Sequence, residues 1–340
     1  MDDENQQHAQ DARDTVGVVG ESTVLDRIVR RLPTAQAATL GPGDDCAVVA
    51  APDGRFVVTT DMMVHGPDFR WAWSSPYDLG WKAAATNLSD VAAMGARPSS
   101  LVVALAVPQD TPVAVLEAFA DGLADACGAL APGCGVVGGD LSTSGTFTIA
   151  VTAFGDLEGR APVLRSGATV GDQVAVAGEL GAAARGLTRL FAEGVDEHGA
   201  PDAGRTAAFL AASPGGSDHG VDRQRRPEPP IVAGVLAAAA GATAMLDLSD
   251  GLAIDAGRLA RASGVSIDLD PAAVPDAASL FGGEDHGLFA TYPAATILPA
   301  AFRRIGTVVD AAGEPGVLLA GEPVGTAGWD PYADWDGNVG

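Results

Sequence analysis

The sequence predicts a two-domain protein of mixed α/β or α+β class. Its 340 residues exceed the size that one hydrophobic core usually organises, so two domains are the default expectation. Short apolar runs typical of buried strands alternate with longer stretches whose apolar residues recur at helical spacing. Because 47% of the residues are hydrophobic and only 5% are aromatic, the cores must be built mainly from Ala, Val and Leu.

The N-terminal domain, expected to contain a mixed sheet covered by helices, is predicted over residues 20–160. Residues 1–19 carry too little apolar surface to offset the entropy cost of ordering, so we expect a disordered tail there. One helix is expected over residues 21–32 and a longer one over residues 75–96, where a Ser-Pro pair supplies the cap and the first residue. The other expected elements are the strands "CAVVA", "RFVVTTD", "SLVVALAV", "CGVVGGD" and "TFTIAVTAFG" and the helix "PVAVLEAFADGLADACGAL".

The C-terminal α/β domain is predicted over residues 161–340. It begins with a turn and a strand in "RSGATVGDQVAVAG", and two helical stretches follow. Residues 213–230, before the second of these helices, are rich in Gly, Pro, Ser and charge, and we expect a mobile loop there. "AMLDLSDGLAIDAGRLARASGVSIDLD" is typical of strand, turn, helix and strand, and "GGEDHGLFATY", "RRIGTVVD" and "GVLLAG" predict further strands.

Composition excludes several classes of function. The formal net charge is −24, from 44 acidic and 20 basic residues, which argues against non-specific nucleic-acid binding. No apolar run approaches the ~20 residues that span a bilayer, and the acidic N-terminus is unlike a signal peptide, so we expect no membrane association. Cys46, Cys127 and Cys134 show no metal-ligand spacing, which is consistent with reduced thiols in a cytoplasmic protein.

Lys82 is the only lysine in the chain. A Walker A loop needs a Gly-Lys-Ser/Thr sequence and a protein kinase needs a lysine on a strand, so both of these nucleotide-binding architectures are excluded. Lys82 stands eight residues before Asp90 on the predicted helix, at a spacing that allows both to share one face. We nevertheless expect a solvated lysine.

Aspartates adjoin apolar strand-like runs in both halves of the chain. Asp44 and Asp45 precede "CAVV", whereas Asp61, Asp140 and Asp247 follow such runs, at the strand end where ligands of α/β sheets bind. The alternative is that these carboxylates are ordinary solvated residues at strand ends. The aspartates together, most of them beside Gly, Ser or Thr, favour a shared site.

Two further aspartates, Asp90 and Asp250, end Leu-Ser-Asp tripeptides. The first tripeptide lies in "TNLSDVAAMGA" and the second in "LDLSDGLAIDAG", and an Ala-rich helical run follows each of them. By itself this repeat is only weak evidence that the two halves of the protein face one another.

These carboxylates predict a hard divalent cation. Mg²⁺ takes one or two carboxylates, keeps several waters and completes its octahedron with substrate phosphates. Zinc would require paired His and Cys, and a calcium loop requires a D-x-D-x-D-G spacing, and the sequence has neither. Several Mg²⁺ ions with a phosphate-rich substrate point to phosphoryl transfer, whose catalysis is mostly positioning and charge neutralisation.

Two glycine pairs precede acidic residues, in "VGGD" at 137–140 and "GGED" at 282–285. Glycines let main-chain N–H groups approach a phosphate closely. A plain tight turn is the alternative interpretation of both motifs.

The ordered set of motifs resembles the thiamine-monophosphate kinase family, of the aminoimidazole-ribonucleotide-synthetase-like superfamily. The resemblance covers roughly residues 20–335 and rests on "GESTVLDRI", "GPGDDCAVV", "VVTTDMMVHGPDF", "KAAATNLSDVAAMGARP", "VVGGDLS", "LRSGATVGD", "LDLSDGLAIDAG" and "GGEDHGLFAT". It implies a synthetase-like fold and ATP-dependent phosphorylation of thiamine monophosphate to thiamine diphosphate with Mg²⁺. It also implies direct in-line transfer without a phosphoenzyme, and a homodimer formed through the N-terminal domains.

The same resemblance implies the residues of the site. The metal ligands are expected to be Asp45, Thr59, Thr60, Asp61, Asp90, Asp140, Asp247 and Asp250. The residues among them expected to be catalytic are Asp45, Asp61, Asp90, Asp140 and Asp250. The expected ATP contacts are Gly139, Asp140, Arg165 and Ser249, and the expected substrate contacts are Asp68, Glu284 and Tyr332.

Two positions depart from the pattern of the family. Asp68 stands where the family usually has a histidine, and His65 lies three residues earlier. His286 follows "GGED" where a tyrosine is commoner.

The chemistry of the implied acceptor explains the many carboxylates. A phosphate monoester has a second pKa of about 6, so near neutral pH it is mostly a dianion and needs no general base. The obstacle is its repulsion from ATP, because two unit charges about 4 Å apart interact by roughly 4 kcal/mol at an effective dielectric near 20. We therefore expect a site with many aspartates that hold cations, a single candidate arginine, and no catalytic lysine or histidine.

Other functions stay open on the sequence alone. A ring-closing aminoimidazole-ribonucleotide synthetase or a selenophosphate synthetase of the same superfamily is one alternative. The latter usually has a reactive Cys or Sec and a lysine near the N-terminus, and no lysine precedes Lys82 here. A non-catalytic scaffold that binds divalent metal is the alternative from a different class.

Overall fold

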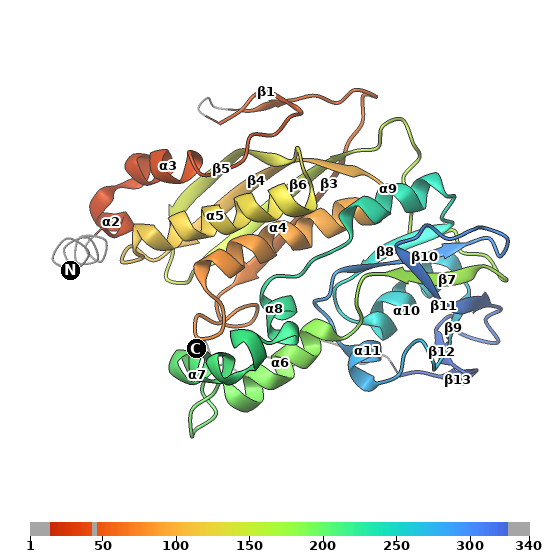
Figure 1. The fold of residues 1–340 in the computed structure, drawn as a ribbon. Helices are drawn as coiled ribbons and strands as arrows, with labels where there is room; N and C mark the ends of the chain where they lie inside the picture. Colours follow the sequence, from red (N-terminus) through yellow and green to blue (C-terminus); the bar gives the residue numbers. More distant parts are fainter. Residues whose placement is uncertain (1–13, 43–45, 326–340) are drawn as a thin grey trace.

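The computed structural model describes residues 14–42 and 46–325 (Figure 1). The predicted site residues Asp45 and Tyr332 lie outside these described residues, as does Asp44. The described chain contains two larger sheets, one in each half, and a two-stranded sheet of β1 (Ala38–Leu40) and β2 (Val48–Val49). The mixed α/β class predicted from the sequence is confirmed.

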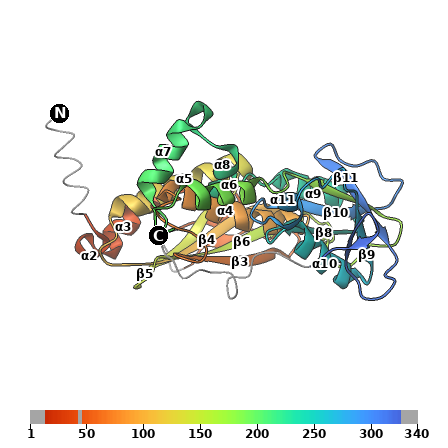
Figure 2. The same cartoon turned by 90° about the horizontal axis from the view of Figure 1, so that it is seen from below.

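The N-terminal half is built on a four-stranded sheet in the order β3-β6-β4-β5. Its strands are β3 (Val57–Val64), β4 (Arg97–Val107), β5 (Gly135–Thr143) and β6 (Thr148–Asp156). β6 is antiparallel to β3 and β4, and β5 is parallel to β4. Figure 2 shows helices α4 (Pro76–Ala93) and α5 (Val113–Leu130) on one face of this sheet.

Helix α4 begins where the sequence predicts, because its end is capped locally. The Ser75 side chain accepts the N–H of Asp78, and the Asp78 carboxylate accepts the N–H of Ser75. α4 packs closely on α5 through glycines: a Cβ at Gly80 would lie 1.9 Å from the carbonyl oxygen of Phe119. α4 also contacts β3 and β6 on one side and β8, β10 and α9 of the other half on the other. It is therefore the element shared by the two halves.

The C-terminal half is built on a seven-stranded mixed sheet in the order β13-β12-β9-β11-β7-β10-β8. Its strands are β7 (Gln173–Ala177), β8 (Ala244–Leu248), β9 (Ser266–Leu269), β10 (Gly287–Tyr292), β11 (Phe302–Val309), β12 (Val317–Leu319) and β13 (Glu322–Pro323). Its α-helices are α6 (Ala182–Glu193), α7 (Ala203–Ala212), α8 (His219–Arg225), α9 (Ile231–Ala239), α10 (Leu252–Ser263) and α11 (Ala277–Phe281). Buried residues of α9, among them Ile231 and Ala237, join the core of the N-terminal half.

The prediction of a disordered tail over residues 1–19 is wrong for its last part. Residues Val16–Val19 form helix α2, which precedes α3 (Glu21–Val29). The N–H groups of Val16 and Gly17 donate to the carbonyls of Thr111 and Gln109 at 2.9 Å, and Val16 and Val19 pack against the core. Composition missed this contact because its partner lies about a hundred residues away along the chain.

Residues 213–230, predicted as a mobile loop, are not a loop throughout. The segment contains a 3₁₀ turn (Pro214–Gly216) and helix α8. Asp218 caps α8 by accepting the N–H of Val221, whose side chain is fully buried. Composition alone predicts a loop here, whereas the N-cap at Asp218 and the burial of Val221 stabilise a helix.

In the described part of the chain, no helix combines the length and the apolar character needed to cross a membrane.

Candidate active site

Carboxylates from both halves of the chain converge around the C-terminal part of α4. Asp90 of α4 lies near Asp61 of β3 and Asp247 of β8, close enough that the charges of both act on it. The Asp90 carboxylate accepts a hydrogen bond from Thr59 Oγ1 at 2.8 Å. Burial, reinforced by the charges of Asp247 and Asp61, raises the pKa of Asp90 to about 7.

Asp61 of β3 is a second carboxylate whose ionised form is disfavoured by its surroundings. Its backbone N–H donates to Asn87 Oδ1 at 3.2 Å, which ties β3 to α4. Burial raises the pKa of the Asp61 carboxyl, and the charges of Asp247 and Glu284 raise it further, although His286 opposes them. Burial and nearby negative charge thus disfavour the ionised forms of Asp61 and Asp90, and a bound cation would stabilise these forms.

Asp247 is tied to both α4 and the loop before β10. Its Oδ2 atom accepts a hydrogen bond from Ser89 Oγ at 2.9 Å and lies 3.4 Å from His286 Nδ1. Burial disfavours the imidazolium of His286, but the hydrogen bond to Asp247 and the charge of Glu284 raise its pKa overall. The structure thus places His286 beside Asp247, and the expectation that no histidine is catalytic stays a prediction.

Lys82 is buried, so the prediction of a solvated lysine is wrong. It is only 5% exposed, and its Nζ lies 2.6 Å from Glu284 Oε2 and 3.1 Å from Gln224 Oε1. Eight residues are slightly more than two helical turns, so Lys82 and Asp90 lie on neighbouring parts of one α4 face. That spacing was the signal that could have identified Lys82.

Two predicted substrate residues, Asp68 and Glu284, line one small cavity. It has a volume of about 140 Å³, and Lys82, Ser249 and Trp73 also contribute to its wall. Asp68 Oδ2 accepts the backbone N–H of Val64 at 2.7 Å, and burial raises the pKa of this carboxyl. The cavity wall therefore combines two carboxylates with two basic side chains, Lys82 and Arg70, and with aromatic rings.

Asp250 differs from Asp61, Asp90 and Asp247 in being paired with an arginine. Arg258 Nη1 lies 2.6 Å from Asp250 Oδ2 and 2.6 Å from Asp255 Oδ1. Burial, together with the charge of Asp250, raises the pKa of Asp255 to about 6.

Asp140 and Thr60 lie on the other face of the N-terminal sheet. Asp140 pairs with Ala104, and Ala104 pairs with Ala150, whose other partner is Met62. Side chains that pair directly share a face, so Asp140 shares the face of Met62, opposite to Asp61. Thr60 is on this same face and accepts a hydrogen bond from Thr152 at 3.1 Å. Within one chain, the strand pairing therefore keeps these two residues out of the cluster.

Gly139 and Arg165 are two of the predicted ATP contacts, and they lie in different parts of the fold. Gly139 lies within strand β5, which rules out a tight turn at "VGGD", and a Cβ there would lie 2.0 Å from the carbonyl oxygen of Val103. The side chain of Arg165 is exposed, and its carbonyl accepts a hydrogen bond from Ser263.

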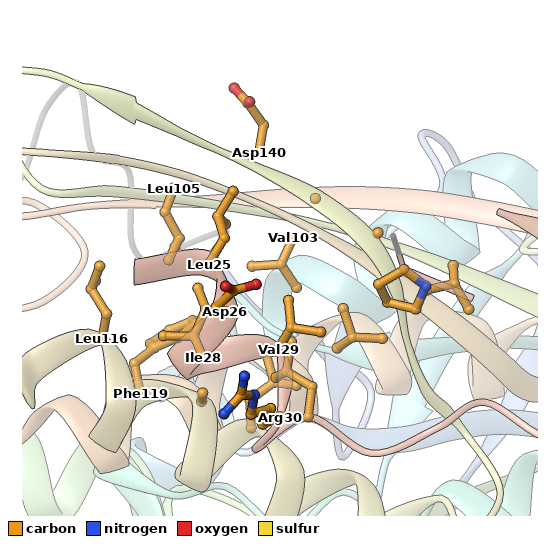
Figure 3. Close-up of a pocket in the computed structure, with 18 of the residues that line it drawn as sticks. Leu25, Asp26, Ile28, Val29, Arg30, Val103, Leu105, Leu116, Phe119 and Asp140 are labelled. Atoms are coloured by element: carbon orange, nitrogen blue, oxygen red, sulfur yellow. The ribbon is translucent and has the colours of Figure 1, made fainter. Parts of the chain in front are cut away.

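A larger cavity of about 550 Å³ lies between α3, α5 and the strands β4 and β5 (Figure 3). Its lining is mostly aliphatic and aromatic, and the carboxylate of Asp140 points away from it. Its described lining contains Asp26 and Asp140 but none of Asp61, Asp90 and Asp247, so this cavity is separate from the carboxylate cluster.

No group of three or more His, Cys, Asp or Glu side chains is placed to hold a metal ion within residues 14–42 and 46–325. The structure thus brings Asp61, Asp90 and Asp247 together in one region without forming a closed coordination shell. A group of carboxylate oxygens of this kind nevertheless suits a hard divalent cation that keeps waters of its own.

Comparison with known proteins identifies the family. The family model of the "AIR synthase related protein, N-terminal domain" matches residues 43–157. The thiamine-monophosphate kinase of Mycobacterium tuberculosis (strain CDC 1551 / Oshkosh) is 42% identical over 95% of this chain and 94% of its own length. The chain belongs to the thiamine-monophosphate kinase family.

Other members of this family agree in length and in fold. The thiamine-monophosphate kinase of Corynebacterium glutamicum is 37% identical over 94% of this chain and 95% of its own. The crystal structure of the kinase from Stenotrophomonas maltophilia K279a matches with a TM-score of 0.71 at 31% identity, over 88% of this chain and 97% of that one. A structure described as AaThiL complexed with AMPPCP and TMP matches with a TM-score of 0.69 at 31% identity, over 92% and 96% of the two chains.

Proposed function

We propose that this thiamine-monophosphate kinase family member transfers the γ-phosphoryl group of ATP directly to thiamine monophosphate, and that the product is thiamine diphosphate. Family membership and the described complex of a relative with AMPPCP and TMP support the choice of substrates. The structural observation that carries the proposal is the cluster of Asp61, Asp90 and Asp247, in which burial and neighbouring carboxylates raise the pKa values of Asp61 and Asp90.

Mg²⁺ is the cation we propose for this cluster, because the available donors are carboxylate and hydroxyl oxygens. The residues proposed to hold it at this cluster are Thr59, Asp61, Asp90 and Asp247, with Asp250 nearby. The other metal ligands predicted from the sequence are Asp45, Thr60 and Asp140; of these, Thr60 and Asp140 lie on the opposite face of the sheet, so they would hold a cation at a place other than this cluster. When bound, the ions would supply positive charge between two polyanionic substrates.

The protein's own residues would bind and orient the two substrates. The acceptor phosphate is mostly a dianion at neutral pH, so its oxygen can attack without transferring a proton to the protein. Asp68 and Glu284 would hold the cationic, ring-containing part of the acceptor in the small cavity, next to Trp73. Gly139, Asp140, Arg165 and Ser249 remain the proposed ATP contacts.

A homodimer is the proposed state of assembly. On the sheet face opposite α4, the side chains of Phe56, Val58 and Met62 are 57%, 56% and 62% exposed. An exposed apolar sheet face of this kind is typical of an interface between copies. Asp140 and Thr60 share this face, so a dimer formed through it would place both residues at the subunit interface. We also propose a cytoplasmic location.

A single assay tests the function. Purified protein is incubated with ATP and Mg²⁺ and with thiamine monophosphate, an aminoimidazole precursor or selenide as alternative acceptors, and both ADP and the phosphorylated product are measured. We expect thiamine diphosphate to form, and we expect the activity to stop in EDTA and to return with added Mg²⁺. ADP release with either of the other acceptors would favour a synthetase, and Mg²⁺ binding without turnover of any acceptor would favour a non-catalytic scaffold.

A further inference from the structure

Lys82 and Glu284 form an ion pair between the two halves of the protein. Lys82 belongs to α4 of the N-terminal half, and Glu284 belongs to the loop between α11 and β10 of the C-terminal half. Their charged atoms are 2.6 Å apart, and the side chain of Lys82 is 6% exposed. The side chain of Glu284 is 39% exposed overall, but its Oε2 atom is buried.

The backbone around Glu284 is held in an unusual conformation. Glu284 has a φ of 73° and His286 a φ of 51°, both in the left-handed region that non-glycine residues rarely adopt. The N–H groups of the two residues donate to the carbonyls of Ser249 and Leu248 at 2.8 and 3.0 Å. Asp285 accepts N–H groups of Gly181 and Ala183 at the start of α6. The main chain thus directs Glu284 toward α4, and Lys82 is the cation that it meets there.

We propose that Lys82 is a positioning residue for Glu284: it holds this carboxylate in the wall of the substrate cavity, where the carboxylate binds the acceptor. The inference rests on the proposed function and deepens it, because it names the residue that sets the affinity for the acceptor.

Charge and burial support this role. Burial alone would disfavour the ionised form of Glu284, but Lys82 and His286 lower its pKa below the ordinary value. His286 is the weaker of the two partners, because its Nε2 atom is 4.0 Å from Glu284 Oε2. Both Lys82 and Glu284 line the cavity of about 140 Å³ that also contains Asp68. Without Lys82, a partly buried carboxylate would lose its main counter-charge.

Steady-state kinetics and binding of thiamine monophosphate by calorimetry test the role of Lys82. We expect Lys82→Met to weaken binding of thiamine monophosphate, and to raise its KM, by on the order of 10- to 100-fold, with little change in the KM for ATP. Lys82→Arg retains the positive charge and should recover part of this loss. Arg226→Met is the matched control, because Arg226 pairs with Asp78 of the same helix α4 but lies outside the cavity.

The double variant separates positioning from a general structural effect. If Lys82 acts through Glu284, Glu284→Gln and Glu284→Gln/Lys82→Met should have the same affinity for thiamine monophosphate. The double variant also removes both charges, so it remains measurable even where Lys82→Met alone is unstable. Additive losses, an equal rise in the KM for ATP, or an equal effect of Arg226→Met would overturn the proposal. Failure of the wild-type protein to phosphorylate thiamine monophosphate would instead reject the proposed function.

Discussion

The two Leu-Ser-Asp tripeptides, residues 88–90 and 248–250, have the same sequence and different structures. The first lies inside helix α4, whereas the second begins at the last residue of β8 and continues into the turn before α10. They nevertheless meet, because Ser89 of the first donates to Asp247, the residue just before the second. The weak indication that the two halves face one another is confirmed by this contact.

The aspartates of the two tripeptides, Asp90 and Asp250, have different charged neighbours. Asp90 has Thr59 as a hydrogen-bond donor, and burial together with the neighbouring carboxylates raises its pKa to about 7. Asp250 is paired with Arg258 at 2.6 Å. The same tripeptide therefore has a different chemical role in each place, because the fold surrounds it with different charges. Asp90, which has no cation paired with it in the described part of the chain, would gain more from a bound metal ion than Asp250.

The largest expected effect is on turnover. Asp90→Asn should lower kcat by at least about 1,000-fold while the circular dichroism spectrum stays that of the wild type, because the amide keeps the shape but cannot neutralise a cation. Asp250→Asn should cost less, since the arginine already balances this carboxylate. If Asp90→Asn keeps turnover near that of the wild type, Asp90 does not belong to the metal site.

The next effect concerns cation binding without any substrate. Mg²⁺ at millimolar concentration should raise the Tm of the EDTA-treated wild type by several degrees, because it binds the folded protein and offsets the carboxylate repulsion. The same titration of Asp90→Asn should give little or no shift. An equal shift in both proteins, measured by differential scanning fluorimetry, would place the cation elsewhere.

The pH dependence of the metal-free protein should follow Asp90. The pKa of Asp90 is raised in the folded state, from 3.8 to about 7, so the folded state binds a proton more tightly than the unfolded state does. This contribution to stability is present at low pH and is lost as the pH rises from about 4 through 7. Denaturant unfolding across this range should show a steeper loss for the wild type than for Asp90→Asn. Parallel profiles would contradict the assignment.

The smallest effect is a difference of sign between the two aspartates. In the metal-free protein near pH 8, Asp90→Asn should increase the free energy of unfolding, because it removes a buried charge that neighbouring carboxylates repel. Asp250→Asn should decrease it by less than about 1 kcal/mol, because the pair with Arg258 is partly exposed to solvent. Changes of the same sign, measured in urea, would remove the distinction between the two sites.

The elements that the sequence predicts correctly are those encoded by local signals. The start of α4 follows from the Ser75 cap and the proline behind it, and β3 and β4 follow from apolar runs. Helices α2 and α8 could not be predicted from local composition, because contacts with distant segments stabilise them. Val16 of α2 donates to the carbonyl of Thr111, and Val221 of α8 is fully buried.

The features of the candidate site likewise fall into those that local motifs predict and those that depend on distant contacts. The identities of Asp61, Asp90, Asp247 and Glu284 follow from their motifs, and a carboxylate-rich cation site is a prediction of composition and spacing. The burial of Lys82 could not be predicted in this way, because it depends on a carboxylate that is about two hundred residues away in the chain. The separation of Asp140 from Asp61 likewise depends on the pairing register of four strands.

The α/β class, the family and most of the oxygen donors follow from the chain alone, because these are properties of short motifs and of their order. The folded structure was needed to show which carboxylates repel one another, which have a fixed cation, and which side of the sheet each one occupies. The physical reason is that the charge state of a side chain depends on distances and desolvation, and these are set by packing between segments far apart in the chain.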